Sequence, residues 1–154
     1  MHAIEQFCEK FGTRYNAPQD LVLRAIGRQL HLFTPAQATL IDAHQPVVGG
    51  GIFLGSVQKD DFTPSAQFID IFLKDSENVV TLDEKTAWLY LCGRDVIEAS
   101  GVQLMVPSHT HVIIKDKLGQ ILGYGVTANP KRARGVVVQN IYDKGIMLRR
   151  EMTK

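Results

Sequence analysis

Three cations lie close together in the sequence, at Lys131, Arg132 and Arg134, directly after Asn129 and Pro130. Ammonium and guanidinium groups bind phosphate well, because they stay charged at neutral pH and donate several hydrogen bonds. Proline interrupts an extended strand, so we expect these cations on a loop, where binding residues often lie. The chemistry that they predict is the binding of a polyanion.

Two apolar runs flank this basic loop and are expected to position it. Residues 121–128 and 136–138 are rich in apolar side chains, which predicts two strands. Gly123 and Gly125 are two residues apart, so they lie on one face of the first strand. Glycine at these positions leaves room for another backbone or a ligand to approach closely.

Positive charge is concentrated in the second half of the chain. Residues 1–78 hold 6 basic against 9 acidic side chains, a balance of −3, whereas residues 79–154 hold 11 against 7, a balance of +4. This asymmetry indicates a polyanionic partner for the second half. The alternative is that these charges only solvate the surface of a globular domain.

The composition is that of a globular chain, with 154 residues, 45% hydrophobic and 21% charged, and it fits one domain or two small ones. The apolar runs are too short to span a bilayer, and the first residues lack the basic and apolar regions of a signal peptide. We therefore expect a cytoplasmic protein without a membrane partner. Cys8 and Cys92 have no CxxC spacing, which predicts reduced thiols.

The first half mixes helix and strand patterns. Thr34, Pro35 and Gln37 form a strong helix start, because threonine caps the helix, proline suits its first position and glutamine completes a capping box. The predicted elements are a helix over 4–11, a hairpin of strands 21–26 and 29–33, a helix over 34–44, and strands over 52–59 and 67–73.

The second half is dominated by short strand patterns with glycine turns. The predicted elements are a strand over 79–82, a helix over 84–91, one helical turn that ends at Gly101, and strands over 112–115, 120–128, 135–140 and 146–151. We interpret the chain as an α+β protein. A small α/β domain with an antiparallel sheet occupies residues 1–78, and a small β-barrel with helical inserts occupies residues 79–154.

No pattern of residues predicts catalysis. Residues 123–128 match the dinucleotide pattern G-x-G-x-x-A, but that motif must open a helix and here Asn129 and Pro130 follow. His109 and His111 have a spacing that could hold a metal, but no cysteine or carboxylate pair completes a site. We therefore expect no enzyme activity, no catalytic residue, no cofactor and no metal.

Trp88 is the only tryptophan of the chain and falls within the predicted helix over 84–91. With Ala87 and Leu91 it forms one helical stripe that could face a core. We therefore interpret Trp88 as a core residue, in preference to a platform for base stacking.

Several segments carry a family resemblance. Gly93–Val102 followed by Asp116–Val126 resembles the PUA domain, an RNA-binding pseudobarrel. The whole chain resembles the nuclear import protein seven family of two-domain factors for large ribosomal subunit biogenesis, in its archaeal form. The segments that carry this second resemblance, in order, are residues 49–55, 68–72, 91–96, 122–126 and 145–151.

The resemblance implies binding of RNA, with pre-ribosomal RNA as the expected partner, and it assigns a basic surface to Arg149, Arg150 and Lys154. A turn at 143–145 would return the last strand toward the loop cations. We therefore expect one basic patch that joins these three residues to Lys131, Arg132 and Arg134. Charges that protect an edge strand are the alternative.

The sequence therefore favours a non-enzymatic RNA-binding factor in pre-rRNA processing. It leaves open a protein-interaction adaptor, and an accessory RNA-recognition protein of an RNA-modifying or RNA-degrading complex. Ribosome-assembly or RNA-processing proteins are possible partners, and no DNA is expected.

Overall fold

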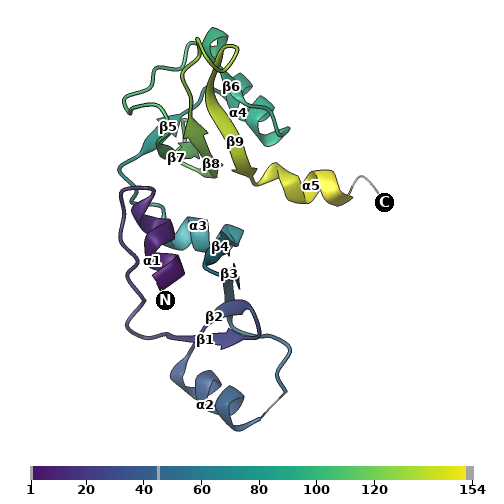
Figure 1. Cartoon of the computed structure of the whole chain (residues 1–154). Coiled ribbons are helices and arrows are strands. Elements are labelled where there is room, and N and C mark those ends of the chain that lie inside the picture. The colour runs from purple at the N-terminus through teal and green to yellow at the C-terminus, as the bar shows by residue number, and fades with distance from the viewer. Residues whose placement is uncertain (1, 45, 152–154) are drawn as a thin grey trace. The chain divides into compact units, whose positions relative to one another are not determined.

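The computed structural model of the chain describes residues 2–44 and 46–151, without the side chains of residues 150 and 151. It divides into two compact units (Figure 1). The first contains residues 1–9 and 13–74, and the second contains residues 10–12 and 75–154.

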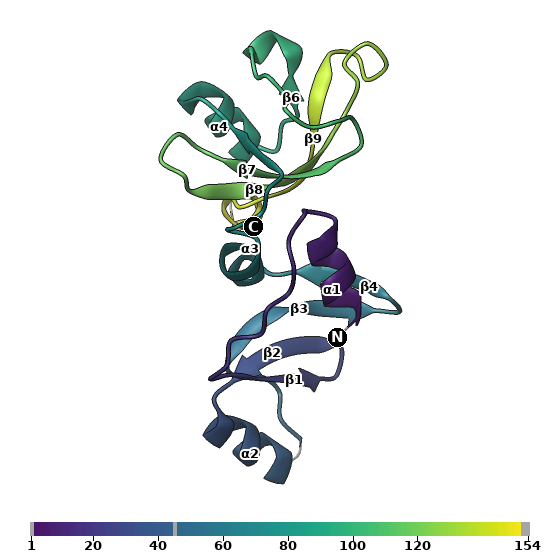
Figure 2. The same ribbon diagram turned by 90° about the vertical axis from the view of Figure 1, so that its left-hand side faces the viewer.

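The first unit is a four-stranded antiparallel sheet with three helices. Its strands lie in the order β1-β2-β3-β4, as Figure 2 shows. The predicted hairpin is confirmed, because β1 and β2 pair around Gly27, whose φ of 59° suits a tight turn. The elements are α1 (His2–Glu9), β1 (Val22–Ile26), β2 (Gln29–Phe33), α2 (Pro35–Ala43), β3 (Ile52–Gln58), β4 (Asp61–Pro64) and α3 (Ala66–Phe72).

The start of α2 follows the predicted chemistry. The Thr34 side chain accepts a hydrogen bond from the Gln37 backbone N–H, and the Gln37 side chain accepts one from the Thr34 N–H. This confirms the capping box.

The strand predicted over 67–73 is wrong, because this segment is the helix α3. Ser65 caps it by accepting a hydrogen bond from the Phe68 N–H at 3.1 Å. The buried side chains Phe68, Ile69 and Phe72 fall on one helical face. The apolar residues thus follow a helical period and not the alternation of a strand.

The second unit contains a curled five-stranded mixed sheet in the order β5-β7-β8-β9-β6, whose strands are all labelled in Figure 1. β5 runs parallel to β7, and the other neighbours are antiparallel. The elements are β5 (Val79–Thr81), α4 (Glu84–Leu91), β6 (Val96–Ile97), the 3₁₀ turn η1 (Glu98–Ser100), β7 (His111–Lys115), β8 (Ile121–Thr127), β9 (Val136–Asp143) and α5 (Gly145–Glu151).

The last of these elements corrects a prediction, since residues 146–151 were expected to form a strand. They form the helix α5, which begins directly after β9.

Close approach of two backbones explains Gly123 and Gly125. A Cβ atom on Gly123 would lie 2.0 Å from the Tyr142 carbonyl oxygen, and one on Gly125 would lie 2.4 Å from the Gln139 carbonyl oxygen. The predicted close approach is thus confirmed, and the neighbour is the strand β9. Below it the core is built from α4 and the sheet, with Tyr90, Val112, Ile114 and Val138 among its fully buried residues.

We expect Gly123→Ala to lower the free energy of unfolding by about 1–3 kcal/mol, because the new methyl group overlaps backbone atoms that cannot rotate away. Urea denaturation followed by circular dichroism measures this change. Gly49→Ala is the control, since no atom lies within 4 Å of its Cβ position. Equal midpoints for the two variants would contradict the prediction.

Candidate nucleic-acid interface

A cavity of about 770 Å³ opens in the second unit between α4, the β6–η1 segment and the first residue of β9. We call it the α4–β6 cavity. Its lining combines two cations, two carboxylates, apolar side chains and a glycine, and the residues are Asp83, Lys85, Thr86, Leu89, Gly93, Arg94, Asp95, Ile97, Ala99, Ser100 and Val136.

Local hydrogen bonds hold the walls of this cavity in place. Asp83 caps α4 by accepting a hydrogen bond from the Thr86 N–H at 2.8 Å. On the opposite wall, β6 pairs with β9, and the Glu98 N–H donates to the Gly135 carbonyl oxygen at 2.7 Å. Gly101 ends η1 with a φ of 75°, which allows the chain to leave the cavity.

The predicted basic loop leads directly into this cavity. It is a compact turn, in which the Asn129 side chain accepts a hydrogen bond from the Lys131 N–H and the Pro130 carbonyl accepts one from the Gly135 N–H. Lys131, Arg132 and Arg134 are all exposed on it. Because Gly135 and Val136 follow at once, the loop cations lie at the border of the α4–β6 cavity.

The cavity and its border carry more positive than negative charge. Five exposed cations lie there: Lys85, Arg94, Lys131, Arg132 and Arg134. None of them has an ion-pair partner among the described residues. Three carboxylates lie there as well, at Asp83, Asp95 and Glu98, and the first two accept hydrogen bonds within the structure. Hydrogen bonds from Thr86 lower the pKa of Asp83, and Asp95 accepts a bond from the Asn140 N–H at 2.8 Å. This leaves cations available for phosphate.

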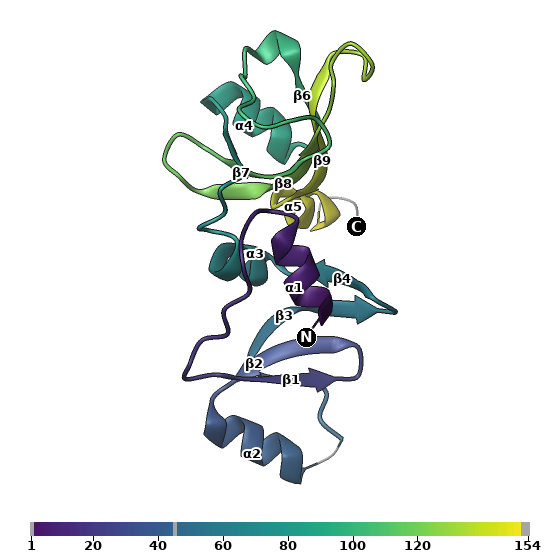
Figure 3. The same ribbon diagram turned by 60° about the vertical axis from the view of Figure 1, so that its left-hand side comes forward.

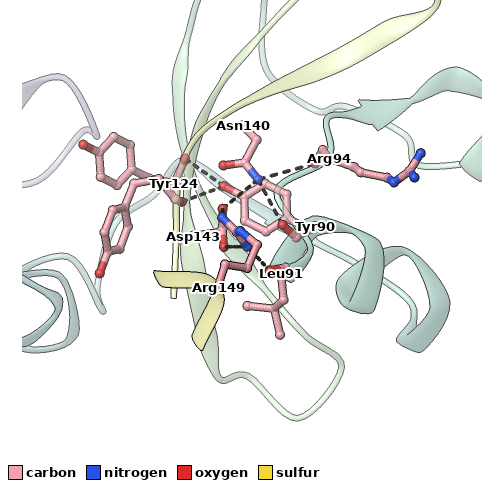
Figure 4. A network of polar contacts seen from close by, with 8 residues as sticks. Tyr90, Leu91, Arg94, Tyr124, Asn140, Asp143 and Arg149 are labelled. Carbon is pink, nitrogen blue, oxygen red and sulfur yellow. Dashed lines mark hydrogen bonds and ion pairs between the residues drawn. The ribbon is translucent and has the colours of Figure 1, made fainter. Parts of the chain in front are cut away.

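Arg149 is bound to buried groups of the second unit, although 38% of its own side chain is exposed (Figure 4). Its guanidinium group donates to both carboxylate oxygens of Asp143, at 2.8 and 2.9 Å, and also to the Leu91 carbonyl oxygen. The Asp143 residue is only 4% exposed. The hydrogen bond to Asp143 raises the pKa of Arg149 above its already high value. Arg149 thus neutralises a buried carboxylate.

Tyr90 and Asn140 extend this network across the unit. The Tyr90 hydroxyl donates to the carbonyl oxygens of Tyr124 at 2.8 Å and Tyr142 at 3.0 Å. Burial raises the pKa of Tyr90, and the charge of Asp143 adds to this effect. The Asn140 side-chain amide donates to the Tyr90 carbonyl at 3.0 Å and to Asp143 at 3.2 Å. The end of α4 is thereby fixed to β9.

The single basic patch expected from the sequence is wrong. The loop cations precede the first residue of β9 and α5 follows its last residue, so they lie at opposite ends of an eight-residue strand (Figures 1 and 3). Such a strand is about 25 Å long. The roles predicted for Arg149 and Arg150 in RNA binding stay predictions, and Lys154 lies outside the described residues.

Sequence reasoning did not predict that Lys85 and Arg94 line a cavity, because nothing in their spacing indicates that α4 and β6 enclose one. It also misplaced Trp88, which was expected in the core and is 68% exposed on α4. The helix turns Thr86, Ala87 and Tyr90 inward instead. Tyr124 is 9% exposed and stacks on Tyr142, so it offers no free ring face.

Two further classes of site have no support in the described residues. Within residues 2–44 and 46–151, no three histidine, cysteine, aspartate or glutamate side chains gather where they could hold a metal ion. In the same part of the chain, no helix has the length and apolar character needed to cross a bilayer.

Comparison with known proteins gives a match to the second unit. Residues 78–152 match the family model of the UPF0113 PUA domain. A conserved PUA domain protein from Thermoplasma acidophilum has a similar structure, with a TM-score of 0.57, 17% identity, and coverage of 96% of this chain and 91% of that chain. A PUA domain from Aeropyrum pernix K1, solved with tartrate, gives a TM-score of 0.51 and 15% identity over 90% of this chain and 79% of that one.

No curated protein matches the sequence. The family match and the two similar structures show that the chain contains a PUA domain fold, as the resemblance implied. Membership of the nuclear import protein seven family stays a prediction.

We expect Arg149→Ala to lower the urea midpoint clearly, because Asp143 would be left buried without its cation. Arg24→Ala is the matched control, since Arg24 pairs with Asp42 at 2.9 Å on an exposed surface, where ion pairs contribute little. Arg149→Lys should be intermediate, because lysine cannot bind both oxygens in the same planar geometry. Equal midpoints for Arg149→Ala and Arg24→Ala would contradict a structural role for the pair.

Proposed function

We propose that the protein is a non-enzymatic RNA-binding factor that holds the RNA backbone at the α4–β6 cavity and its basic border. The observation that carries the proposal is the set of five exposed cations without ion-pair partners among the described residues, around a cavity of a PUA domain. PUA domains generally bind RNA. Phosphate contacts of this kind give affinity with little dependence on sequence.

The proposed cellular role is pre-rRNA processing during large ribosomal subunit biogenesis. Its support is the order of the segments that resemble the nuclear import protein seven family, from residues 49–55 to residues 145–151. A factor of this kind would act in the cytoplasm through RNA and assembly proteins, without cofactor or turnover. The RNA-binding proposal itself does not depend on this role.

A protein-interaction adaptor is the second candidate. It is favoured by α5, which exposes Met147 by 61% and Leu148 by 67%. Exposed apolar side chains on one short helix suit contact with another protein. An adaptor that works only in this way would show no appreciable affinity for RNA at low salt, so the experiment below separates the two functions.

The test is the salt dependence of RNA affinity, measured by fluorescence anisotropy with a labelled single-stranded RNA. We expect the affinity to fall steeply as salt rises, with a slope of about 0.7 per phosphate contact in a plot of log K against log salt. Replacing Lys131, Arg132 and Arg134 together by alanine should reduce this slope by about 1.5–2 and weaken binding at least about tenfold at low salt.

The control variant removes the same charge elsewhere. Arg14, Arg28 and Lys59 are exposed cations of the first unit, and their replacement by alanine should leave affinity and slope nearly unchanged. If the loop variant and the control variant fold normally and bind RNA as the native protein does, the proposed interface is wrong. If the native protein does not bind RNA at low salt, the proposed function is wrong.

A further inference from the structure

A second cavity lies on the other side of α4 and takes no part in the interface described above. It has a volume of about 670 Å³ and is formed by α4 together with the turn between β7 and β8. The two most exposed apolar side chains that line it are Trp88, 68% exposed, and Leu118, 84% exposed. We call it the Trp88 cavity.

Both side chains are presented by rigid elements. Trp88 lies in the middle of α4, whose inner residues Ala87 and Tyr90 belong to the core. Leu118 lies at the tip of a tight turn, in which one carboxylate oxygen of Asp116 accepts hydrogen bonds from the N–H groups of Leu118 at 2.9 Å and Gln120 at 2.8 Å. A ligand would therefore meet a preformed surface and would not have to order a flexible loop.

The size of the apolar surface favours a single flat group over a protein. A stable protein interface covers about 800 Å² on each partner and has several apolar residues at its centre. Here only two large exposed apolar side chains line the cavity, and the neighbouring Glu84, Lys117 and Gln120 are polar. An exposed indole ring can stack on a nucleobase, because every base has a π-face.

The charges beside Trp88 fit a nucleotide in a defined orientation. Glu84 and Asp116 both line the cavity, so phosphate is disfavoured within it and the uncharged base is the part that enters. Two cations flank the site. Lys117 lines the cavity, and Lys85 is three residues before Trp88 on α4, which makes the two side chains neighbours on the helix surface.

Lys85 also connects the two cavities. It lines the α4–β6 cavity on one side of α4, while Trp88 lines the second cavity on the other. The three-residue spacing places Lys85 where it can bind the phosphate between a nucleotide on the basic side and one on the tryptophan side.

We propose that Trp88 is a base-stacking platform for single-stranded RNA that crosses α4 from the α4–β6 cavity. This inference rests on the proposed RNA-binding function and adds a second contact to it. One unpaired base stacks on the Trp88 ring beside Leu118, and the adjoining phosphate binds Lys85. The platform gives affinity for unpaired bases that the phosphate contacts alone do not give.

Trp88 is the only tryptophan in the sequence, so its fluorescence reports on this site directly. The experiment titrates the full chain with a twelve-nucleotide oligoadenylate, chosen because purines have a large stacking surface, and follows both anisotropy of labelled RNA and tryptophan emission. We expect quenching of the emission with the same midpoint as binding. Trp88→Ala should weaken binding about tenfold, the effect of one lost stacked base, whereas Trp88→Phe should weaken it less.

Two comparisons separate this inference from its premise. The slope of log K against log salt should be unchanged in Trp88→Ala, because stacking releases no counterions. Leu40→Ala, which removes an apolar side chain that is 60% exposed in the first unit, should bind RNA like the native protein. Thermal unfolding should show that Trp88→Ala remains folded, since the exposed ring contributes little to the core.

The outcomes are distinct. If RNA binds with its steep salt dependence but Trp88 emission and Trp88→Ala affinity do not change, the stacking inference is wrong and the proposed function stands. The exposed tryptophan would then serve another purpose, such as contact with a protein. If RNA does not bind at low salt, both the proposed function and this inference are wrong.

Discussion

The buried carboxylate of Asp143 is the constraint on which the second unit depends. An ionised group that is 4% exposed is costly unless cations and hydrogen-bond donors surround it. The donors come from Arg149, which follows in α5, and from the side-chain amide of Asn140 in β9. Asn140 also binds the Tyr90 carbonyl at the end of α4. One charge therefore fixes α5, β9 and α4 against each other.

The position of α4 matters because a cavity lies on each side of it. On one side, capping by Asp83 and pairing of β6 with β9 enclose a site rimmed by exposed cations. On the other, the turn held by Asp116 faces Trp88. Arg149 differs from these exposed cations, because it neutralises the buried Asp143 carboxylate and has fewer donors left for phosphate. The cations available to a polyanion are those without an internal partner.

Local chemistry made much of the fold predictable, and tertiary contacts account for most errors. The hairpin of strands 21–26 and 29–33 and the helix start from Thr34 to Gln37 were predicted correctly, because turn and capping signals are local. The segments 67–73 and 146–151 were assigned to strands and are helices, because a short apolar run fits the period of a strand as well as that of a helix. The exposure of Trp88 and the pairing of Arg149 depend on which neighbours fill the core. The loop cations were found because charge clustering is visible without a structure.

The most direct test of an RNA interface at the α4–β6 cavity is a map of amide chemical shifts in ¹⁵N-labelled protein titrated with single-stranded RNA. The predicted result is that the largest changes fall on residues 93–100 and 129–136, which form the wall and the basic border of that cavity. Changes that are confined to α5 or to the first unit, with those two segments unaffected, would contradict the account.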